Sequence, residues 1–95
     1  MSKKNEYVEK MKKQLDDWNT DIDTLQVRAN LAKAELKVKY KEQIAELRKK
    51  RQAGQGKLNE IAAAAGDSWE HLKGETERNL SALKAAINEF KSRMK

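Results

Sequence analysis

The sequence predicts an all-α protein, an elongated antiparallel helical hairpin of the coiled-coil type, built as a single domain over residues 1–95. Charged residues make up 38% of the chain and apolar residues another 38%, and proline is absent, a composition typical of long helices. Apolar residues recur at steps of three and four, whereas no segment alternates with the period of two that a strand shows. A chain this short has a thin core or shares one with another copy.

One line of residues at these steps runs from Met11 to Met94 and carries most of the large apolar side chains. Its steps average about 3.6 residues, the period of a straight helix, so we expect little supercoiling. We call this line the apolar stripe and predict that it forms the helix–helix interface. The predicted interface residues are Met11, Leu15, Trp18, Ile22, Leu25, Leu36, Tyr40, Ile44, Leu47, Leu58, Ile61, Trp69, Leu72, Leu80, Leu83, Ile87 and Phe90.

Two glycine-containing segments compete as the place where the chain turns back. Gly66 can take the left-handed conformation that ends a helix, and Asp67 with Glu70 three residues later forms a capping-box pattern that starts the next one. Gly54 and Gly56 also disfavour helix, but no capping residue follows them and the stripe passes through Gly54 in phase. The local signals therefore favour a turn at 66–68.

The predicted hairpin thus has a first helix over about residues 4–65 and a second over about 67–94. A turn at 54–56 and one continuous helix remain open as alternatives. The first helix would be roughly 90 Å long, so the shorter second helix would leave the stripe from Met11 to Leu25 in water. Because burying each such side chain is worth roughly 1.5 to 3 kcal/mol, we expect self-association into a homodimer or a higher oligomer.

A second apolar line lies on the face away from the stripe and indicates another contact surface. It consists of Val27, Leu31, Ala34, Val38 and Ala45. The net charge of +6 is concentrated nearby, because residues 33–51 hold eight Lys and Arg against three Asp and Glu. A solvated helix face is the favoured interpretation of these cations, and contact with an anionic membrane or nucleic acid is the alternative. The cations are Lys33, Lys37, Lys39, Lys41, Arg48, Lys49, Lys50 and Arg51.

No residue pattern indicates catalysis or a bound cofactor. His71 is the only histidine and cysteine is absent, so a multi-histidine metal site and a cysteine metal site within one chain are excluded. Asp16, Asp17, Asp21 and Asp23 spread over several faces of a helix and do not converge on a cation. We expect a protein that is no enzyme, with no cofactor, metal or small-molecule substrate. The charged start and the lack of an 18-residue apolar run predict a cytoplasmic location.

Two stretches carry a resemblance to a known family. Residues 7–23, YVEKMKKQLDDWNTDID, and residues 66–74, GDSWEHLKG, resemble lines typical of small bacterial coiled-coil proteins of uncharacterised activity. That family is loosely tied to stress responses and is likened to the exchangeable apolipoproteins, whose eleven-residue repeats bind lipid. Asn79 stands where the family often has tryptophan, which weakens a lipid-anchoring role for the C-terminal arm. Gly54 and Gly56 stand where alanine is common, which softens the middle of the long helix.

Together, the residues and the resemblance predict a structural or interaction protein that self-associates through the stripe, with a stress-related role. The predicted partners are the protein itself, another coiled-coil protein or an anionic membrane surface. Reversible membrane-surface binding is the alternative function, and non-specific nucleic-acid binding is the third.

Overall fold

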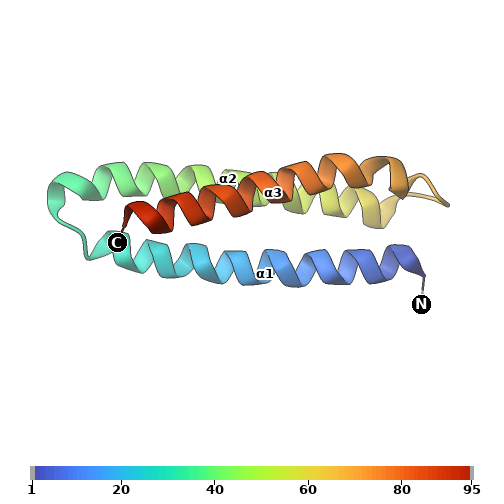
Figure 1. The fold of residues 1–95 in the computed structure, drawn as a ribbon, viewed down its shortest axis with the longest axis horizontal. Helices are drawn as coiled ribbons and strands as arrows, with labels where there is room; N and C mark the ends of the chain where they lie inside the picture. The colour runs from blue at the N-terminus through green and yellow to red at the C-terminus, as the bar shows by residue number, and fades with distance from the viewer. Residues whose placement is uncertain (1, 95) are drawn as a thin grey trace.

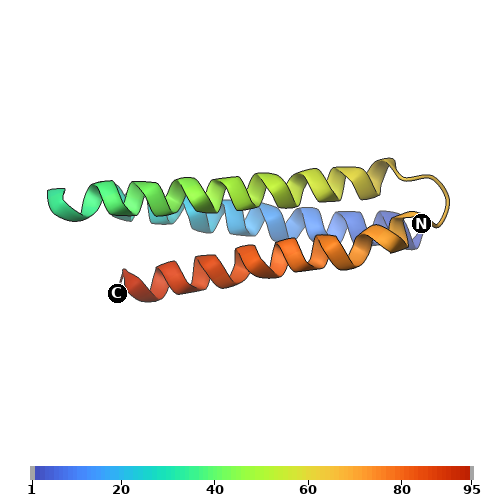
Figure 2. The same cartoon turned by 90° about the horizontal axis from the view of Figure 1, so that it is seen from above.

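The computed structural model describes residues 2–94 and places three helices side by side in an elongated bundle (Figure 1). Helix α1 spans Lys3–Asn30, α2 spans Ala34–Ala63 and α3 spans Trp69–Arg93. α2 runs antiparallel to α1 and α3, as Figures 1 and 2 show from two directions. α2 packs closely on both neighbours, whereas α1 and α3 touch only lightly. The bundle measures 52 × 19 × 18 Å, so its length is set by one pass of helix.

The predicted first helix over 4–65 is wrong, because the chain turns at residues 31–33. Leu31 still has helical angles, with φ −92° and ψ −3°, whereas Lys33 is extended, with φ −59° and ψ 147°. The turn contains neither glycine nor proline, and the Lys33 side chain makes no capping hydrogen bond. No local signal accounts for this turn. Packing accounts for it, because the reversal lays the stripe of α1 onto α2.

The two-helix hairpin and the uncovered N-terminal stripe are therefore also wrong. Three helices of similar length cover one another within one chain, and Leu15, Ile22 and Leu25 are at most 1% exposed. The apolar side chains that were expected to stay in water thus form the core of the monomer.

The predicted turn at 66–68 is confirmed. Gly66 has a φ of 55°, the left-handed value that glycine adopts without strain. The predicted capping box does not form, because the Glu70 N–H bonds to the backbone carbonyl of Asp67 at 3.1 Å. Ser68 precedes α3, and its hydroxyl donates to the Ala65 carbonyl at 2.6 Å instead of capping a helical N–H.

α2 continues through both glycines in its middle, which excludes a turn at 54–56. Gly54 is buried, and an added Cβ there would lie 3.0 Å from Cδ2 of Leu80 and 3.7 Å from Cδ2 of Leu15. Gly56 is exposed, and an added Cβ would meet nothing within 4 Å. The first glycine thus gives α1 and α3 room to approach α2, and the second serves no packing role.

The core runs the length of the bundle and is almost wholly apolar. Its buried polar residue is Thr76, whose hydroxyl donates to the Leu72 carbonyl one turn back at 3.0 Å, so that the group is satisfied within α3. Within residues 2–94, no helix combines the length and the apolar character that crossing a membrane requires.

Candidate functional site

The predicted interface residues other than Leu36 lie inside the bundle rather than on a free surface. Trp18, Tyr40 and Leu72 are half-buried and pack against the core, and Leu36 is 38% exposed. The other predicted residues are buried: Met11, Leu15, Ile22, Leu25, Ile44, Leu47, Leu58, Ile61, Trp69, Leu80, Leu83, Ile87 and Phe90. The reason for expecting self-association, an uncovered stripe, is absent from this fold, and self-association itself stays a prediction.

The predicted basic block does not form one surface. The Arg48 guanidinium lies 3.1 Å from the Asp23 carboxylate of α1, and Lys49 lies 3.7 Å from Glu46 on its own helix. Arg48 and Arg51 are half-buried, whereas Lys49 and Lys50 are exposed. The C-terminal half of the block is thus partly neutralised by neighbouring carboxylates, and the lysines before it lie at the end of the bundle where α1 turns into α2.

Two of the four acidic residues around Trp18 form ion pairs with other helices. Asp23 holds Arg48 of α2, and the Asp21 carboxylate lies 3.3 Å from Lys91 Nζ of α3. Asp16 and Asp17 are exposed on α1. These carboxylates therefore face different neighbours, as the helical spacing predicts, and exposed pairs of this kind contribute little to stability.

Large apolar side chains are exposed at one end of the bundle. Val27, Leu31, Leu36 and Val38 are 59%, 82%, 38% and 66% exposed, and they are the exposed large hydrophobic residues among residues 2–94. All four flank the turn from α1 to α2. We call them the turn patch. Its clustering at one end, rather than its size alone, makes it a candidate contact surface.

Basic residues predominate in the segment that contains the turn patch. Residues 27–41 contain one acidic residue, Glu35, and five basic ones, and none of these five takes part in an ion pair within the described part of the chain. The five are Arg28, Lys33, Lys37, Lys39 and Lys41. A shallow groove at this end is lined by Leu31, Leu36, Tyr40 and Met94 together with Arg28, Ala32, Lys33 and Glu35. Apolar and cationic groups therefore meet in one place.

The opposite end of the bundle is closed by contacts that the sequence did not predict. Lys4 Nζ donates to the carbonyls of Ala62 and Ala64, at 3.3 and 3.0 Å. The rings of Tyr7 and Trp69 have centroids 5.7 Å apart, and Lys73 Nζ lies 5.2 and 5.5 Å from the two centroids. A tilted aromatic pair with a cation beside it stabilises the packing of α1 on α3 at this end.

The phenol of Tyr7, in this cluster, has a raised pKa. Burial is the largest cause that raises the pKa of Tyr7 to about 12, and the nearby Glu77 carboxylate, which accepts a hydrogen bond from the phenol at 3.5 Å, contributes the rest. Both causes favour the neutral phenol, so this group is suited to packing rather than to proton transfer near neutral pH.

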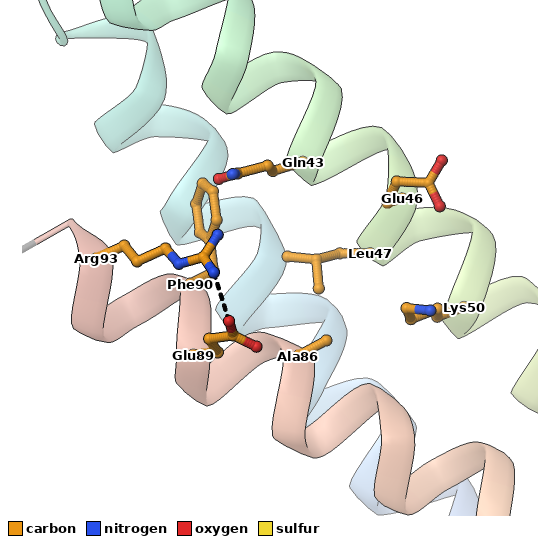
Figure 3. A pocket seen from close by; sticks show the side chains of 8 residues that line it. All are labelled: Gln43, Glu46, Leu47, Lys50, Ala86, Glu89, Phe90 and Arg93. Carbon is orange, nitrogen blue, oxygen red and sulfur yellow. Dashed lines mark hydrogen bonds and ion pairs between the residues drawn. The ribbon is translucent and has the colours of Figure 1, made fainter.

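A second shallow groove lies between α2 and α3, as Figure 3 shows. The Leu47 and Phe90 side chains contribute its apolar part, and the Arg93 guanidinium pairs with the Glu89 carboxylate across one turn of α3. The remaining lining residues are Gln43, Glu46, Lys50 and Ala86. Two carboxylates and two cations balance here, so the groove has no net charge that would select an ionic ligand.

The chemical groups considered for catalysis are dispersed. His71 is exposed on α3, and within residues 2–94 no three His, Cys, Asp or Glu residues come together in a way that could hold a metal ion. The turn patch, with its exposed aliphatic side chains and nearby basic residues, is therefore the candidate functional surface of this molecule.

Comparisons of the chain with protein-family models, curated proteins and solved structures found no match. The resemblance to small bacterial coiled-coil proteins accordingly stays a prediction. Sequence reasoning did find part of the turn patch, because the second apolar line contains Val27, Leu31 and Val38. It placed that line in the middle of a long helix, whereas the structure places it at the end of the bundle.

Proposed function

We propose that this chain is a non-enzymatic helical protein that docks reversibly on anionic lipid surfaces through its α1–α2 end. One observation carries the proposal: exposed aliphatic side chains and cations without partners among residues 2–94 occur together at this end. Leu31, at 82% exposure, is the most exposed of these aliphatic side chains.

An anionic bilayer surface would bind both the exposed aliphatic side chains and the cations favourably. Each Lys or Arg near such a surface contributes about 1 kcal/mol, and each aliphatic side chain that leaves water completely contributes about 1.5 to 3 kcal/mol. The patch side chains lie at the end of a rigid bundle, so they would reach the headgroup region and no deeper. We therefore expect weak, reversible binding that decreases as salt screens the lysines.

The other predicted partners match the patch less well. Cations would strengthen nucleic-acid binding because phosphate contacts dominate its affinity, but Val27, Leu31 and Val38 would contribute little to it. Self-association through the stripe would first require the core to open, because the stripe is buried within the chain. Of lipid, nucleic acid and a second copy bound through the stripe, anionic lipid is the partner that contacts the aliphatic and the cationic groups together.

Vesicle flotation tests the proposal, with phosphatidylcholine vesicles compared with vesicles that also contain phosphatidylserine. The patch variants are Leu31→Asn and the double variant Lys39→Glu with Lys41→Glu. The matched control is Lys10→Glu with Lys13→Glu, which changes the net charge equally on the exposed face of α1, away from the turn. Circular dichroism of each variant shows whether the fold is retained.

We expect the wild-type chain and the control to float with phosphatidylserine vesicles at low salt and both patch variants to remain in solution. Equal loss of binding in patch and control variants would show that net charge alone is responsible and would refute a specific patch. Absence of binding to anionic vesicles, together with a salt-sensitive mobility shift of duplex DNA, would favour the nucleic-acid alternative.

A further inference from the structure

The turn between α1 and α2 has an unusual composition for a chain reversal. Residues 31–33 are Leu, Ala and Lys, which favour helix, and neither glycine nor proline breaks the chain there. Leu31 retains helical angles, whereas Lys33 has extended ones. The side chain of Lys33 does not cap α2. Local preference thus favours a helix that continues through the turn.

The apolar stripe also continues through the turn in phase. Ala29 is buried in the core, and Ala32, Leu36 and Tyr40 follow it at steps of three and four. If residues 31–33 became helical, these four side chains would share one face of a single helix over residues 3–63. The sequence is therefore compatible with both a reversed and a straight connection.

We propose that two copies of the chain exchange α1 by straightening this turn and form a domain-swapped dimer. In it, α1 of each chain packs on α2 and α3 of the other, while the turn around Gly66 remains as it is. The second copy runs antiparallel, so every helix keeps its direction relative to its neighbours. The partner is thus a second copy of this chain, and the proposal goes beyond lipid docking and does not depend on it.

The register between α1 and α2 is the one that such an exchange requires. Lys4 Nζ donates to the Ala64 carbonyl at 3.0 Å and Asp23 pairs with Arg48 at 3.1 Å, so both pairs are centred on residues 34 to 36. Two straight antiparallel helices related by a twofold axis also pair residues about one centre. Here that centre lies just after the turn at residues 31–33, so the same pairs can form between chains.

The exchange keeps the contacts of the monomer and adds some at the axis. α1 packs mainly on α2 and lightly on α3, and the hydrogen bonds and ion pairs of α1 with both helices form again with the partner. Leu36, which is 38% exposed in the monomer, would lie close to its counterpart at the twofold axis. Dimer formation costs the translational and rotational entropy of one free chain. This cost decreases as protein concentration rises, so high concentration favours the dimer.

A proline substitution separates the two connections. Ala34 is the first residue of α2, where proline is well tolerated, and Lys33 before it already has the extended angles that a residue before proline prefers. In a straight helix, Ala34→Pro would remove a hydrogen bond and clash with the carbonyl of Asn30. Lys3→Pro is the matched control, because it also lies at the start of a helix and follows an extended residue, Ser2, with φ −74° and ψ 155°.

The experiment unfolds and refolds each full-length chain at low and at high protein concentration and measures mass by light scattering after size exclusion. A second measurement identifies the exchanged contact. Because the chain has no cysteine, Asp23→Cys chains and Arg48→Cys chains can be mixed, refolded together and treated with a short bis-maleimide. A link between the two kinds of chain then reports α1 of one chain packed on α2 of the other.

We expect wild-type and Lys3→Pro chains to form a dimer after refolding at high concentration, and Ala34→Pro to form about tenfold less or none. The dimer fraction should contain the link between positions 23 and 48, and Ala34→Pro should abolish it. A wild-type chain that stays monomeric at high concentration would overturn the proposal. So would a dimer without the 23–48 link, or an Ala34→Pro chain that dimerises as well as the control.

Discussion

The two glycines of α2 provide a sharp test of how the helices approach one another. Gly54→Ala and Gly56→Ala make the same chemical change two residues apart in one helix. At Gly54 the new Cβ would lie 3.0 Å from Cδ2 of Leu80, whereas at Gly56 it would meet nothing within 4 Å. Any difference in stability between the two variants therefore reports the tertiary contact and not the helix propensity.

The magnitudes follow from these contacts. Replacing a glycine in a helix interior by alanine stabilises it by about 1 kcal/mol, so Gly56→Ala should raise the melting temperature by roughly 4 to 8 °C. Gly54→Ala gains the same propensity, but carbon atoms normally pack about 3.5 to 4.0 Å apart, so Leu80 must move. Overpacking costs about 1 to 3 kcal/mol, here near the low end because a leucine methyl can shift. The net effect should be close to zero or slightly destabilising.

Urea denaturation followed by circular dichroism measures both variants and a double-mutant cycle with Leu80→Val. Valine lacks the Cδ2 atom, so Gly54→Ala should recover most of its gain in that background, while Gly56→Ala should behave as it does in the wild type. Equal stabilisation by Gly54→Ala and Gly56→Ala in the wild-type chain would refute the close approach of α3 to α2 at Gly54.

Three further predictions concern individual side chains. Ile22→Ala should destabilise the fold by about 2 to 5 kcal/mol in urea denaturation because Ile22 is 0% exposed, whereas Val27→Ala should change stability by less than about 0.5 kcal/mol; similar losses would contradict the placement of the core. Thr76→Val should be neutral to within about 1 kcal/mol, because the Leu72 carbonyl keeps its backbone bond in α3, and a clearly larger loss would show that the hydroxyl matters. The pKa of Tyr7 is raised to about 12, so the folded chain keeps a proton that the unfolded chain, with a pKa of 10.0, has lost, and stability should fall as pH rises through this window. Glu77→Gln should lower the pKa of Tyr7 without restoring 10.0, because burial is the largest cause, and a difference titration against Tyr7→Phe tests this.

The candidate site was only partly accessible from the sequence. Hydrophobic spacing separated Val27, Leu31 and Val38 from the stripe, and composition located the basic residues around them. Neither observation shows that these groups gather at one end of a bundle. That depends on where the chain reverses, because a straight helix would have spread the same residues along its side.

Periodicity by itself determined that the chain is helical and which face of each helix is apolar, because a period of 3.6 residues can be read along the sequence without any tertiary contact. Local residue signals located the turn at Gly66, where the left-handed φ of 55° favours glycine. Only the tertiary structure decided the reversal at residues 31–33 and the use of Gly54 as a contact point. Both depend on distances between helices. Ending α1 at Asn30 costs a few backbone hydrogen bonds, but it lets the stripe from Met11 to Leu25 leave water within a single chain. Local residue preferences do not include this burial, so they cannot predict the turn.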